Sequence, residues 1–412
     1  MVTKKMNEKV DILIVGAGQA GAQVAISLRQ GGYLGSIMLV GDEKDAPYER
    51  PPLSKDYLSA DKDRERLLLR KMDFWPSRNI DLWSNKRISA IDSDKQTATT
   101  TSGEVIQYQE LIWAAGGNAR KIPNQNELEG VHVIRTIEDV DCLRDELVDA
   151  SSITIIGGGY IGLEAAAVLT KQNKKVTLIE TQARVLERVA AAPISHFFQD
   201  EHAKNGVNIL TNTSVAKIVH EDNKVSKVIL DDGFEIETDI IIVGIGLLPN
   251  QKVIEDAGGR CGNGVIVDEF CRTSLPHIFA IGDCACHPNI YAQNQYLRIE
   301  SVSNAIDQAK TVAGVILNDK KPYTALPWFW SNQYDLKLQT AGLNHGYDET
   351  VLRGKPQTRS FSLIYLRDGQ VIAVDAVNSV KDFMAGKKLV ENKICPDVQL
   401  LADTDIPLKS LL

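Results

Sequence analysis

Two stretches of the chain share one pattern of apolar and polar positions. In the first, the apolar run DILIVG at residues 11–16 leads into AGQAG, a helix-period stretch AQVAISLRQGG and a second run, SIMLV. In the second, SITIIG at residues 152–157 leads into GGYIG, LEAAAVLTKQN and KVTLIE. Short β-branched runs bounded by glycine predict buried strands, and the longer 3.6-period stretches predict helices. The chain therefore contains the same strand–turn–helix–strand unit twice.

The glycines of both turns have the spacing G-x-G-x-x-G that is typical of dinucleotide-binding turns. They are Gly16, Gly18 and Gly21 in the first unit, and Gly157, Gly159 and Gly162 in the second. The first glycine makes the tight turn, the second lets the backbone approach a pyrophosphate, and the third lets the helix pack on the strand. The helix N-terminus then offers N–H groups to the phosphates. Glycine turns without a ligand are the alternative, but two copies indicate two sites, one for bound FAD and one for a diffusible nicotinamide.

An acidic residue at the end of the second strand of such a unit binds the ribose hydroxyls. In the second unit that residue is Glu180. In the first unit the equivalent position is Gly41, so we assign Asp42, one residue later. A carboxylate near a 2′-phosphate would cost about 1–4 kcal/mol, so Glu180 predicts NADH rather than NADPH. Arg184 and Arg188 follow closely and could soften this preference.

The segment at residues 45–59, DAPYERPPLSKDYLS, places two prolines between Arg50 and Lys55. Proline fixes φ and can open a helix, which reduces the entropy lost in holding nearby side chains. The two cations would then be positioned in advance against an anionic ligand. A surface loop with solvated cations is the alternative.

The remaining strand patterns predict an α/β protein with two Rossmann-like dinucleotide-binding domains and a C-terminal α+β domain. Paired strand-to-glycine exits at YQELIWAAGG and DIIIVGIGLLPN indicate crossings between domains. We therefore expect a discontinuous FAD-binding domain at residues 1–116 and 245–321, an NAD-binding domain at 117–244, and the C-terminal domain at 322–412. In the second FAD segment, ESVSNAIDQAKTVAGVIL predicts a helix with Ser301 or Ser303 as N-cap.

Composition narrows the function classes. The net charge of −8 argues against a nucleic-acid partner, and no apolar run approaches the roughly 18 residues of a membrane span. The N-terminus carries no secretory pattern, so we expect a cytoplasmic protein. Six cysteines are scattered without a C-x-x-C pair, so we expect reduced thiols and no metal site. The first cysteine is Cys142, which leaves no redox thiol for the first domain.

Several motifs together resemble the FAD-dependent ferredoxin reductases of bacterial Rieske-type oxygenase and haem monooxygenase systems. The matching stretches are GAGQAG at 16–21, RPPLSK at 50–55, GGGYIGLE at 157–164, ARVLERV at 183–189, IGD at 281–283, ESVSNA at 300–305 and WFWSNQYDLKLQ at 328–339. The resemblance runs end to end and implies the glutathione reductase fold. It also implies FAD as cofactor, NADH as diffusible substrate and a [2Fe–2S] ferredoxin as partner.

The resemblance also assigns residues. It implies that Arg50 meets FAD phosphate or ribose and that Lys55 lies beside the flavin ring, paired with Glu164. Glu164 lies in an apolar helix pattern, where a carboxylate needs a partner unless it reaches solvent. Further expected FAD contacts are Ala20, Ile88, Ala115, Arg135, Asp283, Val302 and Trp330. Further expected NAD contacts are Tyr160, Ile161, Arg188 and Gly246. A turn aspartate and a core tryptophan are the alternatives for Asp283 and Trp330.

The expected chemistry is hydride transfer from nicotinamide to flavin, followed by release of single electrons to the ferredoxin. The alternatives are a disulfide or peroxide reductase of the same fold, or a redox-sensing interaction flavoprotein that resembles apoptosis-inducing factor. An acidic ferredoxin would need a basic patch, for which the candidates are Arg66, Arg70, Lys71, Arg298 and Lys310. The sequence leaves open which ferredoxin, oxygenase and organic substrate are involved. It also leaves open the oligomeric state, with a monomer slightly favoured.

Overall fold

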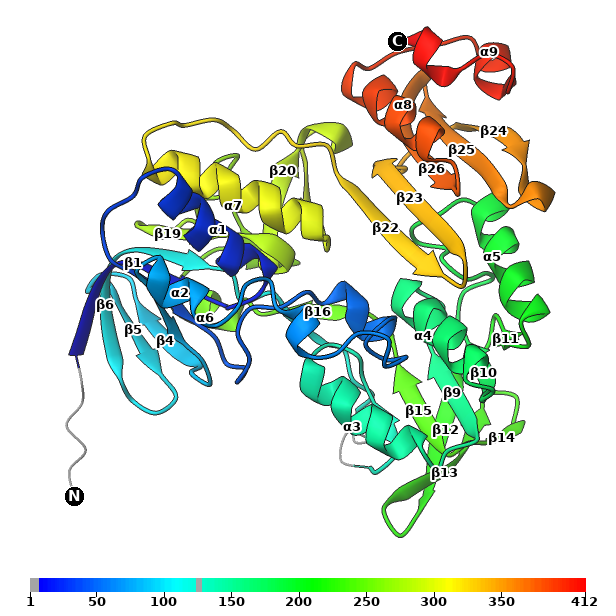
Figure 1. The fold of residues 1–412 in the computed structure, drawn as a ribbon, viewed down its shortest axis with the longest axis horizontal. Coiled ribbons are helices and arrows are strands. Elements are labelled where there is room, and N and C mark those ends of the chain that lie inside the picture. Colours follow the sequence, from blue (N-terminus) through cyan, green and yellow to red (C-terminus); the bar gives the residue numbers. More distant parts are fainter. Residues whose placement is uncertain (1–6, 124–127) are drawn as a thin grey trace. The chain divides into compact units, whose positions relative to one another are not determined.

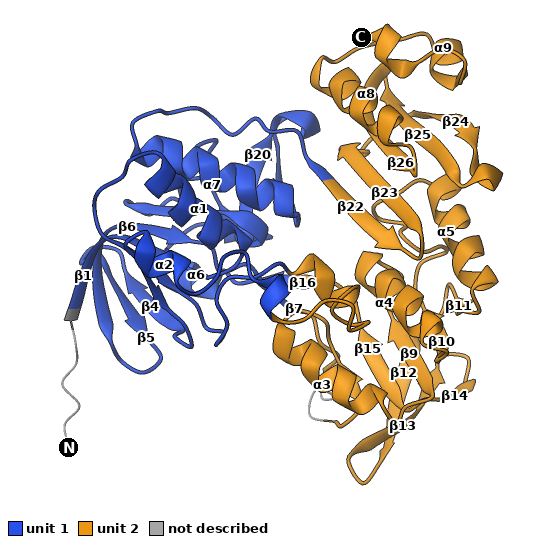
Figure 2. Cartoon of the chain, viewed as in Figure 1, with its two compact units in different colours: residues 1–49, 65–118, 248–328 blue, residues 50–64, 119–247, 329–412 orange. Residues whose placement is uncertain are grey.

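The computed structural model describes residues 7–123 and 128–412 (Figure 1). The chain forms two compact units, each built from three segments (Figure 2). Unit 1 comprises residues 1–49, 65–118 and 248–328, and unit 2 comprises residues 50–64, 119–247 and 329–412. The chain passes between the units at five points, two of which lie within β7 (Gly117–Ala119) and β16 (Leu247–Pro249). Each unit is described by itself.

Unit 1 is built on a mixed sheet whose central strands are parallel. In sheet order the strands are β3 (Ile80–Trp83), β2 (Ile37–Val40), β1 (Asn7–Val15), β6 (Val105–Trp113), β5 (Thr97–Thr100) and β4 (Ile88–Asp92), with β19 (Ile278–Ala280) also paired to β6. The register pairs Ile12 with Ile37 and Val15 with Val40, which places the apolar runs side by side. The carboxyl ends of β1 and β2 therefore meet at one edge of the sheet.

Two helices distant in sequence, α1 (Gln19–Gln30) and α7 (Val302–Ile316), lie side by side on unit 1 and share its larger core (Figure 1). Ser301 is the N-cap of α7, as expected, and its hydroxyl accepts the Asn304 N–H. The other elements of unit 1 are η2 (Glu65–Leu67), α2 (Phe74–Ser77), α6 (Lys252–Asp256), β17 (Cys261–Gly262), β18 (Gly264–Ile266), η3 (Gly282–Cys284), β20 (Ala285–Asn289), η4 (Ile290–Ala292) and β21 (Gln295–Arg298).

Unit 2 contains a five-stranded parallel sheet. In sheet order its strands are β11 (Asn208–Leu210), β10 (Lys175–Ile179), β9 (Ser152–Ile156), β15 (Ile240–Val243) and β8 (Val131–His132). The helices of this part are α3 (Ile137–Leu147), α4 (Tyr160–Lys171) and α5 (Ala192–Lys204). A small antiparallel sheet follows, formed by β12 (Val215–Glu221), β13 (Lys224–Leu230) and β14 (Glu235–Glu237).

The C-terminal part of unit 2 is an antiparallel sheet that packs against α8 (Val380–Glu391). In sheet order its strands are β22 (Trp328–Gln333), β23 (Leu336–Gly342), β26 (Gln370–Val377), β25 (Ser360–Arg367) and β24 (Glu349–Lys355). The short elements are η1 (Pro51–Ser54), η5 (Pro356–Thr358), α9 (Val398–Ala402) and η6 (Leu408–Leu411).

The observed elements confirm the α/β class, the two strand–turn–helix–strand units and the α+β C-terminal part. Residues 50–64 group with unit 2, although the sequence places them in the FAD-binding domain. The division into three domains with the boundaries given above stays a prediction. Among the described residues, none of the helices combines the length and the hydropathy that crossing a bilayer requires.

Candidate dinucleotide-binding sites

The first glycine turn, in unit 1, joins β1 to α1 through positions that exclude any side chain. Gly16 has φ +109°, and a Cβ there would lie 2.2 Å from the Ala114 carbonyl oxygen. A Cβ at Gly21 would lie 2.0 Å from the Gly16 carbonyl oxygen. Around Gly18, in contrast, a Cβ would meet nothing within 4 Å. Gly18 is also the N-cap of α1 and supplies no side-chain acceptor, so the first N–H groups of α1 face an open cradle that suits a phosphate.

The second turn, in unit 2, repeats this geometry between β9 and α4. Gly157 has φ +112°, and a Cβ there would lie 2.4 Å from the Gly244 carbonyl oxygen. A Cβ at Gly162 would lie 2.2 Å from the Gly157 carbonyl oxygen, while Gly159 has open space around it and caps α4 without a side-chain acceptor. The two turns therefore offer the same cradle, one in each unit.

The two units differ at the end of the second strand. Glu180 directly follows β10, and its carboxylate accepts the Gly158 N–H at 2.7 Å and the Gln182 N–H at 2.8 Å. This places an acceptor beside the glycine turn, where a ribose would lie. Directly after β2 stands Gly41, because a Cβ there would lie 2.6 Å from the Ala17 Cβ. Asp42 comes one residue later, with 57% of its side chain exposed and 4.0 Å from the Arg87 guanidinium.

Unit 1 brings further predicted residues close to the first turn. The strand β19 ends before Gly282 and Asp283, and a Cβ at Gly282 would lie 3.1 Å from the Ala20 Cβ. The Gly282 N–H donates to the Gln308 side-chain oxygen in α7 at 2.7 Å, and Val302 is the first residue of α7. Ala20, Asp283 and Val302 therefore lie on elements that pack together.

Two other residues expected at FAD lie on the strands of unit 1. Ile88 begins β4, and its side chain is 3% exposed and belongs to an apolar core cluster. Ala115 follows β6, and its carbonyl oxygen accepts the Asn250 side-chain amide at 2.9 Å. The side chain of Ile88 thus serves the core, and its position in β4 pairs with Thr100 of β5.

The expected ion pair between Lys55 and Glu164 is confirmed within unit 2. The Lys55 Nζ lies 2.7 Å from Glu164 Oε2, and the two side chains are 12% and 5% exposed. Lys55 also donates to the Pro51 carbonyl at 3.0 Å, and Pro51 opens η1 as the prolines predict. Two hydroxyls complete the carboxylate's partners, because Ser54 and Ser331 each donate to it at 2.6 Å.

Sequence reasoning missed these two serines. Ser54 is adjacent to Lys55, so its position in RPPLSK could have indicated it. Ser331 reaches Glu164 from β22, more than 160 residues away, and nothing local marks it. It also accepts the Gln333 amide at 3.2 Å, and the Gln333 oxygen lies 2.8 Å from the His202 ring in α5. A hydrogen-bonded chain therefore runs from Lys55 to a buried histidine, whose pKa burial lowers to about 4.

Arg50 and Arg135, both expected at FAD, meet in unit 2. The Arg50 guanidinium donates to the Arg135 carbonyl at 2.6 Å, and the Arg135 N–H donates to Asp139 at 3.2 Å near the capping box of α3. Trp330 also lies in unit 2, half-buried on β22. The expected FAD residues thus fall in both units.

The residues expected at NAD lie around the second turn. Tyr160 opens α4, with its ring 4.7 Å from that of Phe329 and its hydroxyl buried without a hydrogen-bond partner among the described residues. Ile161 is 46% exposed, and Gly246 has φ +110° after β15. These positions lie around the second turn, whereas the contact with Phe329 was not anticipated.

The two arginines near Glu180 have different surroundings. Arg184 is turned into its own loop, where its guanidinium donates to the Ala190 carbonyl at 2.7 Å and to the Ser195 hydroxyl at 2.5 Å. Arg188 is exposed. Of the two, Arg188 is therefore the one whose charge is available to a bound nucleotide.

The thiols of the described residues are free, and none is suited to a relay beside the first turn. Cys284 follows Asp283 but is fully buried, and burial raises its pKa to about 12, so it stays a neutral thiol at physiological pH. Cys142 and Cys395 are exposed. Within the described ranges, no group of three or more potential ligands could hold a metal ion.

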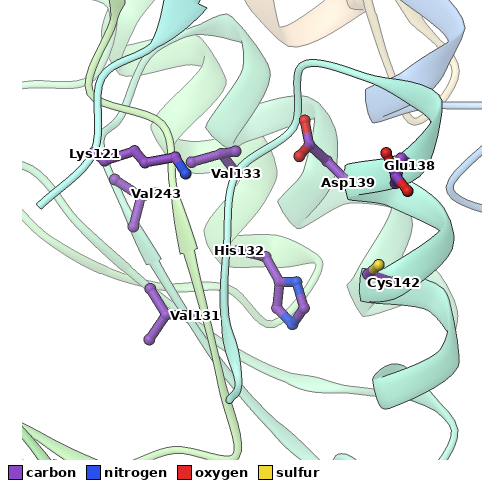
Figure 3. Close-up of a pocket in the computed structure, with 8 residues that line it drawn as sticks. All are labelled: Lys121, Val131, His132, Val133, Glu138, Asp139, Cys142 and Val243. Carbon is purple, nitrogen blue, oxygen red and sulfur yellow. The ribbon is translucent and has the colours of Figure 1, made fainter. Parts of the chain in front are cut away.

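A pocket of about 190 Å³ lies beside α3 in unit 2 (Figure 3). Its lining residues are Lys121, Val131, His132, Val133, Glu138, Asp139, Cys142 and Val243. None of the predicted site residues lines it.

Comparisons with known proteins match nearly the whole chain. The model of the family described as pyridine nucleotide-disulphide oxidoreductase matches residues 10–309, and that described as reductase C-terminal matches residues 328–412. A ferredoxin–NAD(P)(+) reductase of Sphingomonas sp. is 47% identical, over 98% of this chain and 97% of its own. The 5,5′-dehydrodivanillate O-demethylase ferredoxin reductase subunit of Sphingobium sp. is 49% identical, over 97% and 98%. In the crystal structure of the covalent putidaredoxin reductase–putidaredoxin complex, a chain with 39% identity superposes with a TM-score of 0.95, over 98% of both chains.

Proposed function

The chain belongs to the pyridine nucleotide-disulphide oxidoreductase family, and on that premise we propose that it carries electrons from NADH through FAD to a [2Fe–2S] ferredoxin that serves an oxygenase. The expected family resemblance and the glutathione reductase-like fold are confirmed. The observation that carries the proposal is the pair of glycine cradles, one in each unit.

The residues around the first turn fit FAD. Gly16 and Gly21 exclude side chains by close backbone contacts, and the open space at Gly18 admits a pyrophosphate to the start of α1. Asp42 and Asp283 supply acidic side chains for ribose and ribityl hydroxyls. We keep Ala20, Ile88, Ala115, Val302 and Trp330 as proposed FAD contacts, together with Arg50, Lys55 and Arg135.

When bound, FAD supplies the chemistry of accepting two electrons from NADH and releasing them singly. The task of the chain is to position the bound dinucleotides and to stabilise negative charge. The N-terminus of α7 offers N–H groups and a positive dipole end to negative charge. Glu164 and the two serines hold the Lys55 ammonium in one place, so that it is a fixed charge rather than a mobile one.

The second turn fits a nicotinamide dinucleotide, with Gly157, Gly159 and Gly162 at the pyrophosphate. Glu180 already accepts two backbone N–H bonds, which fix its carboxylate beside the turn. A 2′-phosphate at that place would be repelled, so we propose NADH as the preferred reductant. The remaining proposed contacts are Tyr160, Ile161, Arg188 and Gly246.

A thiol-based reductase of the same fold is disfavoured by the cysteines. No cysteine precedes Cys142, and the thiol that follows Asp283 is held neutral by burial. The relatives with 47% and 49% identity are named as ferredoxin reductases, which favours a ferredoxin acceptor over a slow redox-sensing interaction protein.

The candidate cations for docking a ferredoxin have different surroundings. Of the candidate cations, Arg298 is only 8% exposed and pairs with Glu300 at 2.5 Å, and Lys310 pairs with Asp307 at 3.1 Å. Arg70 and Lys71 are exposed in unit 1. If they steer an acidic ferredoxin, its reduction should weaken steeply with salt. We further propose a cytoplasmic location.

The experiment that tests this function is a coupled assay. The purified protein is supplied with NADH, a bacterial [2Fe–2S] ferredoxin and cytochrome c as terminal acceptor. Rapid cytochrome reduction that requires both the protein and the ferredoxin is expected. Slow turnover with every ferredoxin offered, alongside a long-lived complex with NADH, would instead favour the interaction flavoprotein.

A further inference from the structure

The loop that carries the nucleotide-binding acid is held at the glycine turn, where the Leu186 N–H donates to the Gly158 carbonyl at 2.9 Å, and also from outside its own sheet. Residues 180–191 connect β10 to α5 and contain both Glu180 and Arg188. Within the loop, Arg184 braces the far end by donating to the Ala190 carbonyl. The loop contains no regular helix or strand, so its position depends on such contacts.

The C-terminal sheet of unit 2 supplies two further contacts to this loop. The Ala191 N–H donates to the Tyr365 hydroxyl of β25 at 3.1 Å, and that bond is buried. The side-chain amide of Asn344 donates to the Val189 carbonyl at 3.0 Å. Both ends of the segment 189–191 are thereby tied to the C-terminal sheet.

The Tyr365 hydroxyl donates to a buried carboxylate, Asp375, that pairs with no cation among the described residues. The Tyr365 hydroxyl donates to Asp375 Oδ2 at 2.5 Å, and the Thr340 hydroxyl donates to Asp375 Oδ1 at 2.5 Å. Tyr365 and Asp375 are 0% and 1% exposed, and within the described part of the chain Asp375 makes no ion pair. Burial raises the pKa of Asp375 to about 6.

The carboxylate gives the tyrosine hydroxyl a direction. A hydroxyl can donate one hydrogen bond and accept others. Because an ionised Asp375 can only accept, Tyr365 must donate to it, and its lone pairs then face the Ala191 N–H. An apolar residue at position 375 would pack without the cost of a buried charge but would leave the hydroxyl undirected.

We propose that Tyr365, oriented by Asp375, and Asn344 are positioning residues for the nicotinamide dinucleotide. They hold the 180–191 loop so that Glu180 meets the ribose hydroxyls. The proposal rests on the proposed function, because it concerns the same nucleotide site. It assigns to the C-terminal sheet a part in binding the reductant.

The test compares variants that remove a hydrogen bond to the loop with one that removes only a hydrogen bond to the Asp375 carboxylate. Tyr365→Phe removes the hydroxyl between Asp375 and the loop, and Asn344→Ala removes the second contact from a partly exposed position. Thr340→Val is the matched control, because it deletes a donor of the same kind from the other carboxylate oxygen and leaves the Tyr365–Ala191 bond in place. Each FAD-loaded variant is assayed for the KM for NADH, for kcat and for thermal stability.

Loss of one hydrogen bond to the loop should raise the KM for NADH about fivefold in Tyr365→Phe and about threefold in Asn344→Ala, with kcat nearly unchanged. Thr340→Val should lower thermal stability without raising the KM. An unchanged KM in Tyr365→Phe or in Asn344→Ala, or an equal rise in Thr340→Val, would overturn the proposal. Because Asn344→Ala changes a partly exposed side chain, this arm stands even if Tyr365→Phe does not fold.

Different results would remove the proposed function and the role of the C-terminal sheet. Wild-type protein that binds no NADH in a titration of its absorbance would remove the proposed function itself. Wild-type protein that binds NADH, together with variants that bind it equally well, would remove only the role of the C-terminal sheet.

Discussion

Breaking the Lys55–Glu164 pair should cost more than breaking an ordinary ion pair. The charged atoms are 2.7 Å apart and the side chains are 12% and 5% exposed. At an effective dielectric of about 20, two unit charges at that distance attract by about 6 kcal/mol, and desolvation offsets part of this. Removing one partner of a buried pair typically costs about 3–5 kcal/mol, because the other charge is left buried.

The perturbation is a double-mutant cycle of Lys55→Met and Glu164→Gln. In Glu164→Gln the ammonium keeps the Pro51 carbonyl as its neutral partner, and in Lys55→Met the carboxylate keeps two serine hydroxyls. Each single variant should lose about 3–5 kcal/mol in its free energy of unfolding. The double variant leaves no lone charge. Its loss in unfolding free energy should therefore be smaller than the sum of the two single-variant losses by about 2 kcal/mol or more.

The assay is urea unfolding of the FAD-loaded protein, followed by anaerobic stopped-flow measurement of flavin absorbance after mixing with NADH. If the pair shapes the site, both single variants should reduce their flavin more slowly than the wild type. If the two single-variant losses in unfolding free energy sum to within about 0.5 kcal/mol of the loss in the double variant, the two charges are not coupled and the reasoning is refuted. Unchanged reduction rates would remove the pair from the mechanism.

Four further variants test separate parts of the site. Gly159→Ala places a methyl group in the open cradle and should weaken NADH binding about tenfold at an unchanged melting temperature. In Gly157→Ala the new Cβ would lie 2.4 Å from a carbonyl oxygen, so this variant should lower the melting temperature itself. Glu180→Gln removes the repulsion of a 2′-phosphate and should raise the ratio of kcat/KM for NADPH over NADH about tenfold; an unchanged ratio would refute the role of Glu180. Burial lowers the pKa of His202 from 6.5 to about 4, so its contribution to stability is present above pH 6.5 and is lost as the pH falls toward 4. His202→Gln should therefore flatten the pH dependence of the free energy of unfolding between pH 6.5 and pH 4. An unaltered slope over that range would contradict this.

The local sequence pattern was enough to predict the glycine turns, because the requirement for glycine arises from the backbone conformation of the turn itself. Gly16 and Gly157 have positive φ and face a carbonyl oxygen, so no other residue fits and the spacing is visible in the sequence. The N-cap at Ser301 and the helix that opens at Pro51 were predicted for the same reason. The apolar helix pattern around Glu164 indicated that its carboxylate needs a partner, and the family resemblance supplied Lys55 as that partner.

Contacts between segments that are distant in the chain could not be predicted from the sequence. Ser331 reaches Glu164, and Tyr365 reaches Ala191, across more than 160 residues, and neither stands in a distinctive motif. The assignment of residues 50–64 to unit 2 also depends on tertiary packing rather than on pattern. The position of Asp42 shows a third limit, because the close approach of Gly41 to Ala17 displaces the acid from the strand end.

The account depends on two dinucleotide cradles in one chain, of which one retains FAD and the other admits NADH. The most direct measurement is the flavin content of the purified protein, followed by anaerobic titration with NADH. The account predicts one FAD per chain and loss of the oxidised flavin absorbance after about one equivalent of NADH. Protein that carries no flavin and takes none up when FAD is supplied would contradict it.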